Sequence, residues 1–326
     1  MTPQSDLNLE TLLSLYRTML RIRRFEERIV DLYPRQGIRT PVHLCIGQEG
    51  IPAGLCDFLR REDYIFSTHR SHGHCIAKGM SMRVIAAELH GQEEGCSRGR
   101  GGSMHLCDPE WGIPGSTAIV GGSIPLAVGA ALSARMQNNG RIAVAFFGDG
   151  ASEEGSFHES LNFAALHSLP VVFACENNLY ATSSPLEARQ PPAGIAAKGA
   201  GYGIPAVVVD GNDVIAVYHA AGEAVARARR GEGPTLLEFR TWRWKGHVGP
   251  GCDLAAGCRP AGEHAEWLAR CPLEFLGSRL REVGCGEELA ALEGIVAAEI
   301  DDAFAYGQGG TEPDPAGILN DLDGRG

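Results

Sequence analysis

Several common signatures are missing from this sequence of 326 residues. No apolar run approaches the roughly 18 residues that a membrane-spanning helix needs, and residues 1–10 lack the charged and apolar segments of a signal peptide. Lysine and arginine form no long run and the net charge is −11, which argues against nucleic acids and anionic membranes as partners. We therefore expect a cytoplasmic protein that acts on a small-molecule substrate.

Familiar cofactor and nucleophile motifs are also absent or misplaced. Neither GxGxxG nor GxxxxGK[ST] occurs, which weakens a dinucleotide-binding or P-loop assignment. The ten cysteines form no CxxC pair, and most of them are expected to be small buried residues. Residues 95–99 match the GxSxG pattern of a nucleophile elbow, but a helix-like stretch precedes them where the motif requires a strand. We interpret that match as accidental.

A regular alternation of apolar segments and helices begins after residue 122. Short apolar segments with the composition of buried strands lie at 141–147, 170–176, 205–210 and 234–240. Helices are expected between them, at 123–137, 156–167 and 212–230, the last with Asn212 as its N-cap. This alternation predicts an α/β fold with a parallel sheet and helices on both faces.

Changes in composition and apolar pattern divide the chain into three parts. Residues 1–36 are expected to form a helical arm, because apolar side chains recur at helical spacing over 8–33. Residues 37–260 would form the α/β domain, whose first third is rich in glycine and histidine. Residues 261–326 would form a C-terminal helical segment and a tail.

A glycine turn and a doubled asparagine follow two consecutive predicted strands. Asp149 lies between Gly148 and Gly150 after the first of them, and Asn178 follows the second. Ligands of open α/β sheets bind beyond the carboxyl ends of the strands, so Asp149 and Asn178 converge if these strands are neighbours. Their oxygens suit Mg²⁺, which completes its coordination with phosphate oxygens and water. Together, Asp149 and Asn178 favour a magnesium–diphosphate site over the alternative that each belongs to an unrelated turn.

Histidines gather in the segment "STHRSHGH" and again after the last predicted strand. Arg70 could bind phosphate and His72 could donate a proton, whereas His74 is interpreted as a hydrogen-bonded loop residue. A zinc site made of His69, His72 and His74 is an alternative, but no defined fourth ligand accompanies them. His247 lies in a glycine-flanked loop just past a strand end and can reach a ligand there.

Several motifs, in order along the chain, resemble one family. "VHLCIGQE", "HRSHGH", "GRGGSMH", "FHESLNFAAL" and "CENNLYA" are similar to the alpha subunit of the dehydrogenase component of 2-oxo acid and acetoin dehydrogenase complexes. The stretch from Gly148 to Asn178 resembles the thiamine diphosphate motif of GDG followed by NN. The resemblance implies the thiamine-diphosphate-binding fold, with thiamine diphosphate and Mg²⁺ as cofactors.

The resemblance also implies roles for individual residues. Asp149, Asn178 and the backbone carbonyl of Tyr180 would ligate Mg²⁺. Together with the reasoning above, it makes His43, His72 and His247 the candidate catalytic residues. The residues expected to contact the cofactor are His69, Arg70, Ala118, Val120, Gly148, Asp149, Gly150, Ala151, Asn178, Tyr180 and His247. His69 stands where the family often has tyrosine, so the resemblance does not define the contact made at that position.

The implied reaction needs a second chain. The family cleaves a short 2-oxo acid or acetoin, releases CO₂ or acetaldehyde, and passes the acyl unit to a lipoyl acyltransferase. The glutamate that activates thiamine lies on a separate beta subunit, so the resemblance implies a heterotetramer of two alpha and two beta chains. Alternatives are a stand-alone thiamine-diphosphate decarboxylase or carboligase subunit, and a non-catalytic assembly subunit.

Overall fold

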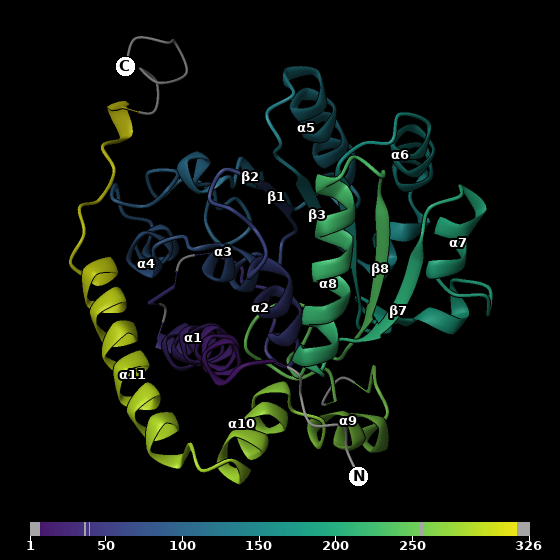
Figure 1. The fold of residues 1–326 in the computed structure, drawn as a ribbon. Coiled ribbons are helices and arrows are strands. Elements are labelled where there is room, and N and C mark those ends of the chain that lie inside the picture. The colour runs from purple at the N-terminus through teal and green to yellow at the C-terminus, as the bar shows by residue number, and fades with distance from the viewer. Residues whose placement is uncertain (1–6, 36, 39, 255–256, 318–326) are drawn as a thin grey trace.

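A six-stranded, fully parallel sheet forms the centre of the molecule (Figure 1). The computed structural model describes residues 7–35, 37–38, 40–254 and 257–317. In spatial order the strands are β2 (Gly115–Ser116), β1 (Tyr64–Ser67), β3 (Ala143–Gly148), β4 (Val171–Asn177), β8 (Thr235–Arg240) and β7 (Ala206–Asp210). The short strands β5 (Tyr180–Ala181) and β6 (Ser184–Pro185) form a separate hairpin. The α/β expectation is confirmed.

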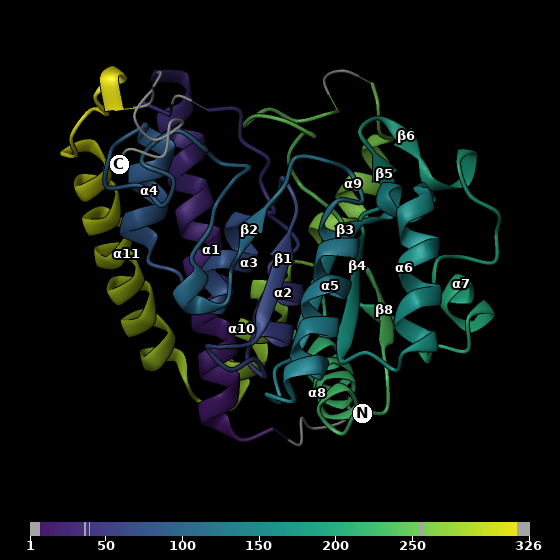
Figure 2. The same cartoon turned by 90° about the horizontal axis from the view of Figure 1, so that it is seen from above.

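Helices cover both faces of this sheet, as Figure 2 shows from above. Against one face lie α5 (Ser123–Gln137), α6 (Gly155–Leu166) and α7 (Ala196–Gly201). Against the other lie α2 (Gly50–Cys56), α3 (His72–Lys78) and α8 (Val214–Arg229). Alternate strand residues enter the two cores, so Val144 and Phe146 face one layer while Ala145 and Phe147 face the other.

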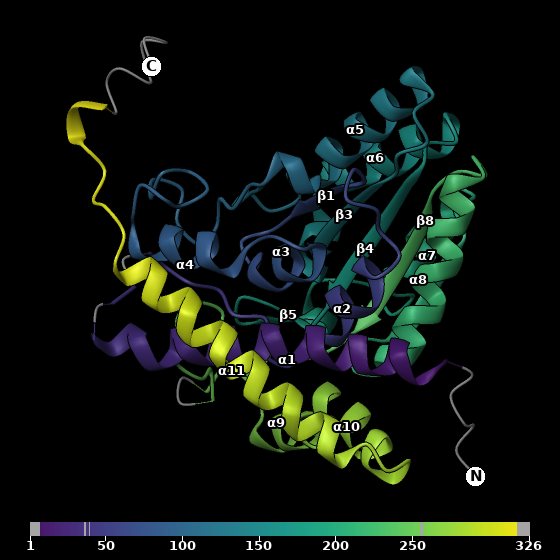
Figure 3. The ribbon, with the colours of Figure 1, turned by 60° about the vertical axis from the view of Figure 1, so that its left-hand side comes forward.

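A second layer of helices lies outside α2 and α3. It contains α1 (Leu9–Leu32), α4 (Met82–His90), α9 (Ala261–Leu268), α10 (Pro272–Glu282) and α11 (Gly286–Gln308). Figure 3 shows α11 crossing α1, and the Phe25 and Phe304 rings meet there with centroids 4.9 Å apart. The three-part division of the chain remains a prediction. In the described part of the chain, no helix combines the length and apolar character needed to cross a bilayer.

Most predicted elements after residue 122 are present, but the cap of α8 is corrected and the sheet has features that were not predicted. Asp213, rather than Asn212, caps α8, and its carboxylate accepts hydrogen bonds from the backbone of Ile215 and Ala216. The amide of Asn212 instead binds the carbonyl of Arg270. Strand β1 was not predicted, and β8 lies between β4 and β7, so the order along the chain is not the order in space.

The cysteines are less uniformly buried than the composition suggests. Cys45, Cys56, Cys75, Cys175 and Cys285 are buried, whereas Cys96, Cys107, Cys258 and Cys271 are partly accessible and Cys252 is exposed. The expectation that most cysteines are buried therefore holds for only half of them.

Candidate active site

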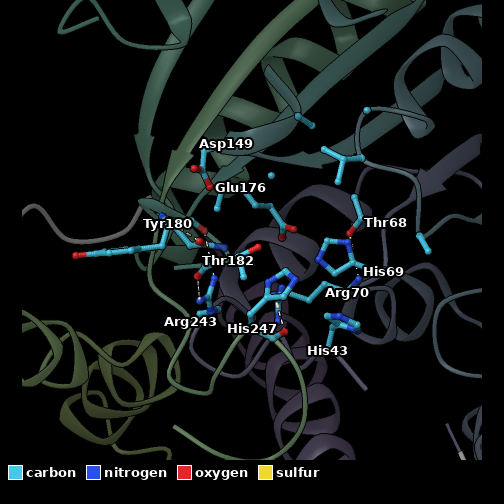
Figure 4. A pocket seen from close by; sticks show the side chains of 18 of the residues that line it. His43, Thr68, His69, Arg70, Asp149, Glu176, Tyr180, Thr182, Arg243 and His247 are labelled. Atoms are coloured by element: carbon cyan, nitrogen blue, oxygen red, sulfur yellow. Dashed lines mark hydrogen bonds between the residues drawn. The ribbon is translucent and has the colours of Figure 1, made fainter. Parts of the chain in front are cut away.

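A pocket of about 200 Å³ opens where the chain leaves the carboxyl ends of β1, β3, β4 and β8 (Figure 4). Parallel strands all end at the same edge of a sheet, so loops far apart in the sequence meet there. The predicted site residues that line this pocket are His43, His69, Arg70, Ala118, Val120, Gly148, Asp149, Gly150, Ala151, Asn178, Tyr180 and His247. Of the predicted site residues, His72 alone lies elsewhere.

Asp149 occupies the end of β3 and begins the short 3-10 helix η3 (Asp149–Glu153). Its neighbour Gly148 pairs with Glu176 of β4, which brings Asn178 to the same edge. Burial raises the pKa of the Asp149 carboxyl, since only 2% of the residue is exposed, and the guanidinium of Arg189 opposes that shift. Arg189 forms ion pairs with both Asp149 and Glu153. A positive charge is thus favoured in front of this carboxylate.

Asn178 and Tyr180 present further oxygens beside Asp149. The Asn178 side chain donates to Gln48 Oε1 over 3.2 Å, and its Oδ1 accepts only a 3.4 Å bond from the Tyr180 backbone N–H. The Tyr180 carbonyl accepts from Arg243 over 3.2 Å, while the phenol ring points away from the pocket toward Glu263 (Figure 4). A carboxylate, an amide and a carbonyl form a set of hard oxygen donors, the kind that Mg²⁺ prefers.

Three histidines from distant segments meet on the opposite wall. Each of His43, His69 and His247 offers a ring nitrogen, and these nitrogens all lie within 4.8 Å of one another. Burial, followed by the charge of Arg70, lowers the pKa of His43 to about 3, of His69 to about 2 and of His247 to about 4. All three imidazoles are therefore neutral near pH 7.

Two arginines make this wall strongly positive. Arg70 is buried and donates to the carbonyls of Leu44 and His247, the latter over 3.4 Å. Burial, with the nearby charge of Arg243, lowers the pKa of Arg70 to about 10. Arg243 also pairs with Asp253 at 2.6 Å. An anion entering the pocket would relieve the repulsion between these guanidinium groups.

Neither His72 nor His74 lines the pocket, although His74 Nε2 lies 3.1 Å from Glu176, which does. His72 is fully buried and is held between Glu26 Oε1 at 3.0 Å and Ser103 Oγ at 2.8 Å. His74 stacks on Phe146 and is hydrogen-bonded to Ser67 Oγ at 2.7 Å as expected, but it lies in helix α3 and not in a loop. The expected catalytic placement of His72 is therefore corrected, because helix α3 directs it into the core. A zinc site built from His69, His72 and His74 does not form.

The comparisons with known proteins agree with this geometry. The sequence profile described as "Dehydrogenase E1 component" matches residues 17–316. This chain belongs to the dehydrogenase E1 component family. It is similar to the alpha subunit of acetoin:2,6-dichlorophenolindophenol oxidoreductase from Bacillus subtilis, with 39% identity over 96% of this chain and 93% of the relative.

Two further relatives are also alpha subunits of dehydrogenases. The corresponding acetoin oxidoreductase alpha subunit of Cupriavidus necator is 42% identical over 97% of this chain and 95% of the relative. The pyruvate dehydrogenase E1 component alpha subunit of Rhizobium meliloti is 38% identical over 95% of this chain and 89% of the relative. The chain is thus an alpha subunit of a thiamine-diphosphate-dependent dehydrogenase, and this E1 family implies a beta subunit as partner.

Several residues of the E1 pocket escaped the sequence analysis. Arg243 lies three residues past the end of β8 and could have been found by the same strand-end argument as His247. Glu176 was treated only as part of strand β4, although it also lines the pocket. Arg189 carries no recognisable signal, because it reaches Asp149 from a loop 40 residues further along the chain.

The accidental GxSxG match also has a structural explanation in this E1 chain. Residues 95–99 lie in turns after helix α4 and not between a strand and a helix. The Ser97 hydroxyl donates to the carbonyl of His105 over 3.3 Å, and no histidine ring activates it. This segment therefore lacks the strand–turn–helix geometry of a nucleophile elbow, as predicted.

Proposed function

We propose that this alpha subunit binds the magnesium–diphosphate end of thiamine diphosphate in the pocket at the strand ends. The observation that carries the proposal is the convergence of Asp149 and Asn178 at the ends of the paired strands β3 and β4. Arg189 already provides a cation in front of Asp149, so the residues fit a positively charged ligand. Mg²⁺ would be held by Asp149, Asn178 and the Tyr180 carbonyl, and would displace the Arg189 guanidinium.

The diphosphate would lie between the metal ligands and the positive wall. Arg70 and His247 would bind its oxygens, helped by Arg243, which the sequence did not suggest. A Cβ atom built on Gly148 would meet nothing within 4 Å, so the backbone there is open to a ligand. His69 takes the place of the family's frequent tyrosine and would contact the cofactor through an imidazole nitrogen. Ala118 and Val120 would contact the other end of the cofactor.

The substrate we propose is acetoin or a short 2-oxo acid such as pyruvate, since relatives of both kinds cover nearly the whole chain. When bound, thiamine diphosphate supplies the electron sink for cleavage of a carbon–carbon bond beside a carbonyl. His43 lies on the pocket wall with its Nδ1 buried and without a hydrogen-bond partner among the described residues. His43 and His247 would hold or transfer protons on the substrate.

The beta subunit would complete this site, in a heterotetramer of two alpha and two beta chains. Support comes from apolar side chains exposed at the pocket rim and on α5: Ile119, Val120, Leu126 and Met136 are each more than half exposed. Gly129 on the same helix has open space around it, so another chain can approach the backbone closely. Transfer of the acyl unit to a lipoyl acyltransferase would follow in the assembled complex.

The test is cofactor binding by the chain co-expressed with its beta subunit. Asp149→Ala should abolish Mg²⁺-dependent thiamine diphosphate binding, measured by calorimetry, while circular dichroism stays unchanged. Asp210→Ala removes a carboxylate at the end of the edge strand β7 and should leave binding intact. Wild-type affinity in the Asp149 variant would overturn the metal assignment. Reduction of dichlorophenolindophenol with acetoin or pyruvate then identifies the substrate.

A further inference from the structure

The glycine-rich segment between α4 and β2 is folded around one buried carboxylate. Glu88 of α4 is only 1% exposed, and its two oxygens accept four backbone N–H groups. The donors are Ser97 and Gly99 to Oε2, at 2.8 and 3.0 Å, and Gly101 and Gly102 to Oε1, both at 2.8 Å. This network fixes the path of the segment, whose backbone N–H groups converge on one carboxylate.

The same network brings two cysteines together. The Cys107 thiol lies 3.6 Å from the backbone carbonyl of Cys96. The Ser97 hydroxyl lies 3.7 Å from the Cys107 sulfur and 3.9 Å from the Cys96 sulfur, so both thiols surround one small side chain. Both cysteines are partly accessible, unlike the buried cysteines of the core. We propose that Cys96 and Cys107 form a peroxide-reactive pair that closes to a reversible disulfide.

The surroundings of the two thiols distinguish their roles. The adjacent Cys96 thiol, and secondarily Ser97, lower the pKa of Cys107 to about 6, against the opposing effects of burial and of Glu88 and Asp108. Hydrogen bonding to Cys107, burial and the Glu88 carboxylate raise the pKa of Cys96, whose sulfur lies 3.9 Å from Glu88 Oε2. Cys107 is therefore the thiolate that reacts first, and Cys96 keeps its proton.

The reaction balances with hydrogen peroxide as the oxidant. The Cys107 thiolate attacks one peroxide oxygen, the O–O bond breaks, and the departing hydroxide takes a proton to become water. Cys107 is then a sulfenic acid. The Cys96 sulfur attacks the Cys107 sulfur, the S–O bond breaks, and the hydroxyl leaves with the Cys96 proton as a second water. Two thiols and one peroxide thus give one disulfide and two waters, and a dithiol reductant reverses the change.

The segment between the two cysteines reaches the active-site pocket. Between the two cysteines, Ser103 bonds to Thr40 Oγ1 at 3.2 Å and to His72 at 2.8 Å, and Met104 lines the pocket. His72 is thus part of the support of this segment. A disulfide would join the two ends of the segment that carries Met104.

The experiment maps the disulfide in the full chain. The reduced protein is treated with equimolar hydrogen peroxide, alkylated and digested with trypsin, which cleaves after Arg98 and Arg100 and so separates the two cysteines. The expected product is a pair of peptides joined through Cys96 and Cys107 that dithiothreitol releases. Between pH 7 and 8 the rate should change less than about twofold, whereas free cysteine reacts about tenfold faster at the higher pH. Absence of the linked peptides would overturn the proposal.

Two variants test the order of events. Cys96→Ser should leave a sulfenic acid on Cys107 that dimedone traps, and Cys107→Ser should leave Cys96 unoxidised. The exposed Cys252 serves as an internal comparison. Preferential oxidation of Cys96 in the Cys107→Ser protein would contradict the assignment of the reactive thiol. If either variant fails to fold, the linked peptides and the pH profile of the wild-type chain still decide the proposal.

Discussion

On one face of the sheet, helices α2 and α3 are themselves covered by α1, and α11 packs in turn on α1 and α4, whereas on the other face α5 and α6 form the outermost layer (Figures 1 and 2). Phe25 of α1 is completely buried, while Phe163 of α6 is 40% exposed. Leu126 and Leu166 on the second face are exposed more than half. Helices α2 and α3 on the first face are therefore enclosed within this chain. The second face has apolar surface left over for another subunit.

The largest loss of stability should follow from removing a buried side chain on the first face. Phe25→Ala removes a ring that packs on Phe304 and should lower the free energy of unfolding by about 3–5 kcal/mol. Phe163→Ala, the matched change on the second face, should cost less than about 1 kcal/mol in the isolated chain. Denaturant unfolding of both variants measures the difference. Equal losses would mean that the two faces are packed alike.

On the second face, substitutions should instead weaken binding of the beta subunit. Leu126→Arg places a charge on the apolar surface of α5 and should weaken binding of the beta subunit at least about tenfold, equivalent to about 1.4 kcal/mol. The stability of the free chain should be unchanged. Val283→Arg, on an exposed apolar residue after α10, is the control and should assemble normally. Sedimentation of the mixed subunits distinguishes these outcomes.

Acid should destabilise the fold through the pocket at the carboxyl ends of the strands. The folded-state pKa values of His43, His69 and His247, about 3, 2 and 4, lie below the ordinary value of 6.5. The unfolded chain therefore binds more protons below about pH 6.5, so stability is full above that pH and falls on acidification. Each histidine contributes a slope of up to about 1.4 kcal/mol per pH unit.

The pH effect has a direct measurement and a control. Chemical unfolding between pH 7 and 5 should show a shallower loss for His247→Gln than for the wild type, and an unchanged loss for the exposed His167→Gln. Inorganic pyrophosphate should reduce the loss, because an anion in the pocket favours protonated imidazoles. If the free energy of unfolding fell equally with pH in all three proteins, protonation of His247 would not contribute to the loss.

The smallest effect is expected where α11 meets α1 at the surface. Arg24 binds both carboxylate oxygens of Glu293, at 2.9 and 3.0 Å, but both side chains are about two-fifths exposed. Glu293→Gln should therefore cost less than about 1 kcal/mol, and that cost should shrink further in high salt. Thermal unfolding at two salt concentrations measures it. A loss as large as that of Phe25→Ala would show that ion pairs, rather than burial, hold α11.

Local pattern explains which parts of the fold could be predicted. Helix α5 and strands β3 and β4 lie where the sequence placed them, because long apolar segments carry a strong periodic signal. Strand β1 has four residues and sits among glycine- and histidine-rich loops, so its signal was too short to separate from them. Asn212 was mistaken for a cap because the adjacent Asp213 has the same local chemistry.

The sequence by itself determined the family, the parallel sheet and the strand ends at which Asp149 and Asn178 meet. These depend on residue type and spacing along a continuous stretch, which a single chain records directly. Only the tertiary structure decided that His72 enters the core, that His43, His69 and His247 share one wall, and that Arg189 faces Asp149. Such contacts join segments far apart in the chain, and their distances follow from packing rather than from local pattern.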